Sequence, residues 1–116
     1  MLKFSVGQMA VMERTGREQF IERLTANLAA DKRFAAGPDH AALARQALEF
    51  GDGQDLTFEI DIAAVAEVML AVASGRVAPE RLGWFRDIVG DARPRKGRRI
   101  RECLAIELRL GAALMR

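Results

Sequence analysis

The sequence has very few of the side chains that most often carry out chemistry. It contains one histidine (His40), one cysteine (Cys103), two serines (Ser5 and Ser74) and no tyrosine. General acid–base and nucleophilic catalysis need a base near neutral pH within hydrogen-bond reach of its partner, and a metal ion needs three or four clustered N, S or O ligands. The sequence offers neither set. We therefore expect no catalytic residue, no metal, no cofactor and no enzymatic activity, and a protein that acts by binding.

Long apolar runs are also missing. Charged residues interrupt every stretch that approaches the roughly 18 apolar residues of a membrane span, and the first residues lack the apolar segment and cleavage site of a signal peptide. The lone Cys103 cannot form an internal disulfide, and its neighbours Ile100, Leu104 and Ile106 favour a buried thiol over a reactive one. We expect a cytoplasmic protein that does not associate with a membrane.

What the chain does have is helical periodicity from end to end. Its 116 residues are 50% hydrophobic and 29% charged, which suits one domain over residues 1–116 with a single core. Apolar spacing, caps and the breakers Gly and Pro predict an all-α fold of about five helices, orthogonal or bundle-like. The predicted helices run from Ser5 to about Phe34, Pro38 to about Phe50, Thr57 to Gly75, Pro79 to Gly90, and Arg98 or Arg99 to about Met115.

Two short segments allow a second interpretation. Leu56, Phe58, Ile60 and Ile62 alternate as in a strand, but no second strand exists to pair with them, so we favour a helix that begins with Thr57 as N-cap and lies at the centre of the domain. The segment 51–55 places acids around glycines, as calcium loops do, yet lacks the remaining ligands of such a loop. We interpret it as a polar turn.

Charge is distributed unevenly along the chain. Residues 1–45 carry a net charge of +2, residues 46–75 a net charge of −6, and residues 76–116 a net charge of +6. Such a chain either pairs its own segments across the fold or offers patches of opposite sign to partners. The sequence leaves both interpretations open.

The strongest local anomaly is the basic run 93–101, with six positive charges in nine residues and no acid. Cations at the start of a helix oppose its dipole, so local stability does not explain them. The candidate partner contacts are Arg95, Lys96, Arg98, Arg99 and Arg101 on the basic side, Asp52, Asp55, Glu59 and Asp61 on the acidic side, and Trp84, which we otherwise assign to the core. We favour a protein partner over nucleic acid, because none of the seven aromatic residues interleaves the basic run.

The order of segments resembles a family of small bacterial helical proteins encoded beside type VI secretion spike and effector genes. The segments that carry this resemblance are Met1–Met9 with Arg17–Leu24, Ala44–Gly51, and the acidic Thr57–Gly75 followed by Pro79 and Trp84. The resemblance implies a non-enzymatic adaptor that engages an effector or spike component before export, or an immunity protein that neutralises a cognate toxin. A nucleic-acid-binding protein remains the second alternative. A homodimer is also open, because the last helix has more apolar positions than one stripe needs.

Overall fold

The computed structural model describes residues 14–34, 37–54, 56, 58–91 and 96–114. Within these ranges the regular structure is five α-helices and one 3-10 turn, which confirms the all-α prediction. The elements are α2 (Arg14–Ala30), α3 (His40–Gly53), α4 (Glu59–Ala73), η1 (Pro79–Arg81), α5 (Gly83–Val89) and α6 (Lys96–Leu114). None of the described helices is both long and apolar enough to cross a membrane.

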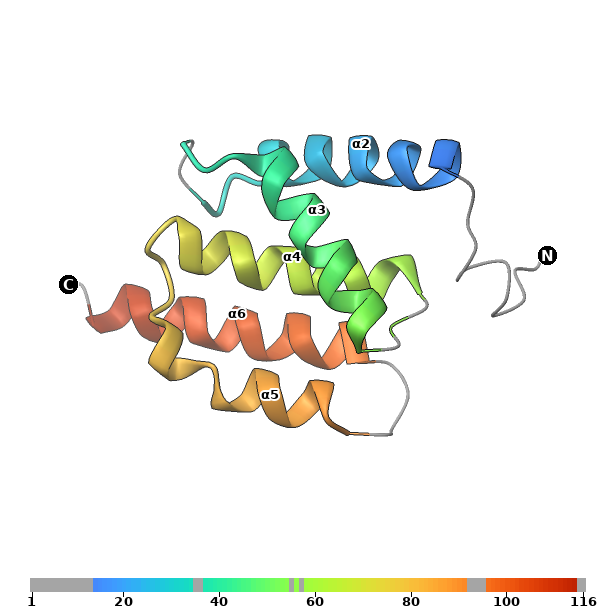
Figure 1. Cartoon of the computed structure of the whole chain (residues 1–116). Coiled ribbons are helices and arrows are strands. Elements are labelled where there is room, and N and C mark those ends of the chain that lie inside the picture. The colour runs from blue at the N-terminus through green and yellow to red at the C-terminus, as the bar shows by residue number, and fades with distance from the viewer. Residues whose placement is uncertain (1–13, 35–36, 55, 57, 92–95, 115–116) are drawn as a thin grey trace.

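Three of the helices, α2, α4 and α6, run in the same direction (Figure 1). α3 crosses α2 and α4 obliquely, and α5 returns alongside α6. Because α4 and α6 are parallel neighbours, their first turns meet at one end of the molecule. That end, described below, is the candidate functional site.

α4 is the central helix, as predicted from its nearly continuous apolar sequence. Five of its fifteen residues are alanine, and small side chains let α2, α3 and α6 pack closely around it. The buried residues of α4 are Asp61, Ile62, Ala64, Val65, Ala66, Val68, Leu70 and Ala71. Only one of these residues, Asp61, is charged.

The apolar stripe predicted for the first helix is confirmed along α2. Phe20, Ile21, Leu24 and Leu28 are all buried, at the spacing that one helix face requires. The helix ends at Ala30, earlier than the predicted Phe34, because the Asp31 carboxylate accepts the backbone N–H of Arg33 at 3.0 Å and closes a turn. The predicted start at Ser5 lies outside the described residues.

α3 both starts and ends later than predicted. Its N-cap is Asp39, whose carboxylate accepts the N–H of Ala42 at 3.0 Å, and Pro38 precedes the helix. The turn predicted at 51–55 is wrong over Gly51–Gly53, which continue the helix. Gly51 is buried there, and a side chain at this position would come within 2.9 Å of Ile62 Cγ1. The glycine thus marks the close approach of α3 to α4.

The ends of α4 confirm one predicted boundary and correct another. The N-cap is Phe58, which makes no side-chain capping bond, and Thr57 lies outside the described residues. Residues 59–62 are helical, so the strand alternative fails there. At the other end, Gly75 has a φ of 78° and its N–H donates to Val72 O at 3.0 Å, while Arg76 N–H donates to Ala71 O at 2.9 Å. Gly75 closes the helix as predicted, in a Schellman motif.

The last two helices also differ from prediction at their starts. Pro79 opens the 3-10 turn η1 rather than an α-helix, and α5 begins at Gly83. α6 begins at Lys96, two to three residues before the predicted start, so Gly97 lies inside the helix and not in a connector.

Candidate functional site

The first turn of α6 is capped by a side chain from α4. Gly97 N–H donates to Asp61 Oδ1 at 2.6 Å, and Asp61 is only 7% exposed. The first four N–H groups of a helix have no partner within the helix, and its N-terminus carries partial positive charge. Asp61 therefore satisfies one open donor and complements the dipole of α6. Our prediction of Asp61 as a surface contact for a partner is wrong, because the carboxylate is buried and used internally.

Glycine at position 97 makes this contact sterically feasible. A Cβ atom there would lie 2.6 Å from Asp61 Oδ1, 3.0 Å from Ile60 O and 3.1 Å from Asp61 Cα. Two of these three atoms belong to the backbone, which cannot rotate aside. The start of α6 therefore lies directly against Ile60 and Asp61 at the start of α4.

Two large apolar side chains are exposed next to this contact. Phe58 is 68% exposed and Ile60 is 57% exposed. Lys96 and Arg98 flank in sequence the glycine whose Cβ position lies 3.0 Å from the backbone oxygen of Ile60. We call the four residues Phe58, Ile60, Lys96 and Arg98 the α4–α6 corner. It places two exposed apolar residues of α4 at the end of the molecule where α6 begins with the exposed Arg98.

The described members of the basic run differ in how they are engaged. Lys96 Nζ donates to Val89 O at 2.8 Å, Arg99 pairs with Asp91 at 3.3 Å, and Arg101 pairs with Glu67 at 2.9 Å. Arg98 pairs with Glu102 at 3.3 Å, one turn further along the same helix, and its side chain is 68% exposed. An exposed pair of this kind contributes little and exchanges easily for another partner. Arg95 lies outside the described residues.

The acidic segment pairs mainly with α2. Asp52 accepts from Arg17 at 2.8 Å, and Glu59 accepts from Arg23 at 3.2 Å. Asp55 lies outside the described residues. The segment predicted to carry an acidic patch is thus partly neutralised by the arginines of α2, a pairing that the charge distribution along the chain did not indicate.

Glu67 is the point where three elements meet electrostatically. It accepts from Arg101 of α6 at 2.9 Å and from Arg33, after α2, at 3.0 Å. Arg33 also pairs with Asp31 at 2.7 Å, and its hydrogen bond holds the pKa of the Asp31 carboxyl below its ordinary value. Hydrogen bonds to Asp31 and Glu67 in turn raise the pKa of Arg33. This cluster joins α2, α4 and α6, and Arg101 acts in it as an internal partner.

Trp84 belongs to an aromatic cluster rather than to an open surface. It is half-buried, and its ring meets Phe85 edge-on at 6.1 Å between centroids, while Phe85 lies 5.9 Å from Phe50. The indole Nε1 is buried and finds no hydrogen-bond acceptor among the described residues. Phe85 therefore joins α5 to α3, and Trp84 packs against the core from the same helix as Phe85.

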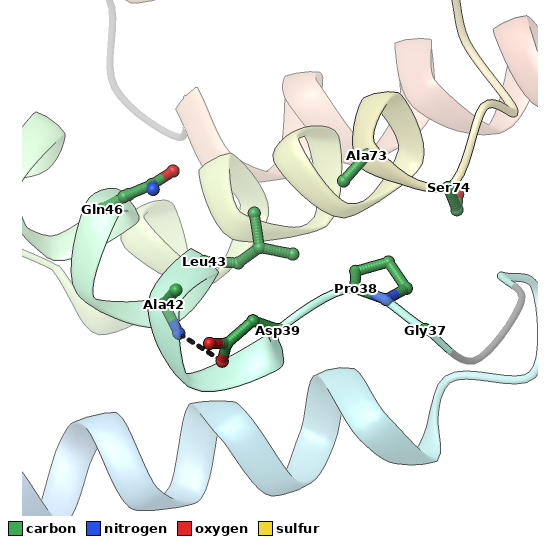
Figure 2. A pocket seen from close by; sticks show the side chains of 8 residues that line it. All are labelled: Gly37, Pro38, Asp39, Ala42, Leu43, Gln46, Ala73 and Ser74. Atoms are coloured by element: carbon green, nitrogen blue, oxygen red, sulfur yellow. Dashed lines mark hydrogen bonds between the residues drawn. The ribbon is translucent and has the colours of Figure 1, made fainter.

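A hollow of about 530 Å³ lies at the opposite end of α4. Figure 2 shows its walls, formed by the start of α3 with Pro38, Asp39, Leu43 and Gln46, and by Ala73 and Ser74 at the end of α4. The Asp39 carboxylate is already engaged with Ala42 N–H, and the other polar groups do not converge on one point. A specific ligand pocket needs a few convergent polar groups, so this hollow is a weaker candidate than the corner.

The two residues that first drew attention for chemistry lie apart. His40 is the first residue of α3, and Cys103 is partly buried against the core from α6. Among the described residues, no group of three or more His, Cys, Asp or Glu side chains could hold a metal ion.

Comparisons with known proteins give no identification. No family model matches the chain, and neither the curated proteins nor the solved structures include a match. The proposal below therefore depends on the residues and their geometry.

Sequence reasoning placed Ile60 in the buried central helix and named Phe58 only in the strand alternative, and so missed the exposure of both residues. Glu67, seven residues after Ile60, gave no signal for this exposure, because its carboxylate is engaged by Arg33 and Arg101.

Proposed function

We propose that this chain is a non-enzymatic protein-binding accessory and that its partner docks on the α4–α6 corner. The observation that supports the proposal is the exposure of Phe58 and Ile60 at the start of α4, against which the first turn of α6 packs. Single exposed apolar residues are ordinary. Two of them at the start of one helix, with the exposed Arg98 at the start of the helix packed against it, offer the apolar and charged groups that an interface combines.

The chemistry of the corner specifies the partner's surface. Phe58 and Ile60 would be covered by apolar side chains, and Arg98 would exchange its exposed pair with Glu102 for an Asp or Glu of the partner. Fully burying a large apolar side chain contributes about 1.5–3 kcal/mol. Charge complementarity would chiefly set the association rate and the choice of partner.

The resemblance described above supports a narrower form of the proposal, in which the partner is an effector or spike component of type VI secretion. The alternative role is that of an immunity protein. The two roles differ in the fate of the partner: an adaptor leaves the activity of its effector intact after release, whereas an immunity protein holds its toxin inactive in a tight complex. Co-expression with the partner, scored by growth of the producing cells, separates them.

DNA or RNA is the second alternative. Lys96, Arg99 and Arg101 each contact a protein acceptor, which leaves fewer cations directed at phosphates and so favours a protein partner. Binding to random-sequence DNA with an affinity that falls about a thousandfold between roughly 50 and 200 mM salt would contradict our proposal.

The test is an affinity capture from native host cells with three baits: the wild-type chain, the double variant Phe58→Ser/Ile60→Ser, and the control Glu49→Ser. Glu49 is an exposed residue of α3 and belongs neither to the corner nor to α6. We expect the double variant to lose, by at least about tenfold, a protein that the other two baits retain. Purified partner then repeats the comparison by calorimetry. Equal capture by all three baits would refute the proposed site.

A further inference from the structure

A second exposed apolar feature lies further along α6. Ile106 is 48% exposed and Leu110 is 45% exposed. Residues four apart occupy the same side of a helix, so the two side chains form one stripe. The inward side of α6 is already supplied by Ile100, Leu104 and Leu108, which are all buried. The helix therefore has two apolar sides, and no described element covers the second.

The charges that flank Ile106 along α6 have opposite signs. Glu102 and Arg109 are both exposed. They are seven residues apart, which places them on the same side of α6 and about 10.5 Å apart along its axis. Ile106 lies between them. Glu102 has only the exposed pair with Arg98, and Arg109 makes no ion pair with the part of the chain that the structure describes.

We propose that the side of α6 around Ile106 is the interface of a homodimer in which the α6 helices of two copies pack antiparallel. The two-fold axis passes between residues 105 and 106, halfway between Glu102 and Arg109. Each Glu102 then faces the partner subunit's Arg109, and the two Ile106 side chains meet beside the axis. A two-fold interface must be complementary to itself, and this arrangement of charges meets that requirement.

The charges also select the direction of packing. Parallel α6 helices in register would place Glu102 against Glu102 and Arg109 against Arg109, and like charges brought together are unfavourable. Antiparallel packing instead places Glu102 against Arg109 in both contacts, and opposite charges attract.

The size of the surface predicts a weak dimer. One pair of helices covers less than the roughly 800 Å² per partner of a standard interface. We therefore expect a dissociation constant in the micromolar range. Sedimentation equilibrium of the full chain from about 10 to about 500 µM, which brackets such a constant, should show the mass rise from 12.8 kDa toward twice that value. A mass that stays at 12.8 kDa throughout would overturn the proposal.

Charge reversal tests the pairing itself. Glu102→Arg and Arg109→Glu should each weaken self-association by at least about tenfold, because each places like charges across the axis twice. Mixed in equal amounts, the two variants should form a heterodimer, since one then carries only positive charges at the two positions and the other only negative charges. The double variant Glu102→Arg/Arg109→Glu should dimerise again. Failure of both the mixture and the double variant to associate, with folding intact by circular dichroism, would overturn the antiparallel pairing.

A matched control is Glu49→Arg, which makes the same charge change at an exposed position on α3. It should dimerise as the wild type does, and a monomeric Glu49→Arg would mean that net charge, not the α6 stripe, governs association. The inference does not depend on the proposed function, because it uses none of the four residues of the α4–α6 corner. Loss of partner capture with an intact dimer, or the reverse, shows which of the two proposals has failed.

Discussion

Replacing Gly97 by alanine tests the packing on which the α4–α6 corner depends. The added methyl group would lie 2.6 Å from Asp61 Oδ1, 3.0 Å from Ile60 O and 3.1 Å from Asp61 Cα. The two backbone atoms cannot rotate away, so α6 must move off α4 by several tenths of an ångström. That displacement lengthens the hydrogen bond from Gly97 N–H to Asp61, which is 2.6 Å in the wild type.

Two opposing effects set the magnitude. Alanine favours the helix by at most about 1 kcal/mol relative to glycine. Against this, weakening a hydrogen bond to a charged group costs about 1.5–3 kcal/mol, and overpacking a close contact costs about 1–3 kcal/mol. The steric effect exceeds the gain in helix propensity, and we expect Gly97→Ala to lower the free energy of unfolding by about 2 kcal/mol. For a domain of this size that corresponds to a fall in Tm of about 10 °C.

Urea unfolding followed by circular dichroism measures the change, and two other glycines provide controls. A Cβ at Gly53 or at Gly83 meets no atom within 4 Å, so Gly53→Ala and Gly83→Ala should be neutral or stabilising by up to about 1 kcal/mol. A Gly97→Ala variant as stable as these controls would refute the close packing of α6 on α4.

Three further predictions concern other parts of the fold. Gly75→Ala should lower the free energy of unfolding by about 1–2 kcal/mol in urea titrations, because the φ of 78° at this position is unfavourable for any residue with a Cβ; an unchanged value would exclude the left-handed helix end. Trp84→Phe should change stability by less than about 1 kcal/mol, since the lost ring area is offset by removal of a buried Nε1 that has no acceptor among the described residues; a larger loss would reveal a hydrogen bond from the indole. Arg33 lowers the pKa of Asp31 in the folded chain, so Asp31 contributes stability above its ordinary pKa of about 3.9 that is lost as the pH falls through the lowered value. Asp31→Asn should thus be less stable than the wild type at pH 7 and approach it near pH 2, and a difference that persists at low pH would argue against this linkage.

Periodicity in the sequence predicted the helices well but not all of their ends. The stripe through Phe20, Leu24 and Leu28 and the central position of α4 follow from which residues are apolar and how they are spaced. Gly51 and Gly97 misled the prediction for one reason. Glycine inside a helix usually signals a break, whereas here each glycine makes room for a neighbouring helix. Only the contact between helices in the folded chain shows whether a glycine breaks its helix or makes room for a neighbouring one.

The same limit applies to the charged residues of the candidate site. The sequence places Asp61 in an acidic segment, and its burial depends on where α6 begins, a boundary set by Asp61 itself through Gly97. Arg23 and Glu59 likewise pair between two helices, although the two residues are 36 positions apart in the chain. Local pattern gives the sign of each charge, whereas the fold determines whether that charge faces a partner, a neighbouring helix or water.

The most direct measurement of the central claim is site-specific photo-crosslinking in the native host, with a photoreactive residue at position 58 or position 60. A third probe at position 49, which is an exposed position on α3, serves as the reference. The account predicts that positions 58 and 60 yield the same adduct with one other protein, and that Arg98→Glu reduces that adduct. Crosslinks from position 49 with none from positions 58 and 60, or adducts of positions 58 and 60 with nucleic acid alone, would contradict it.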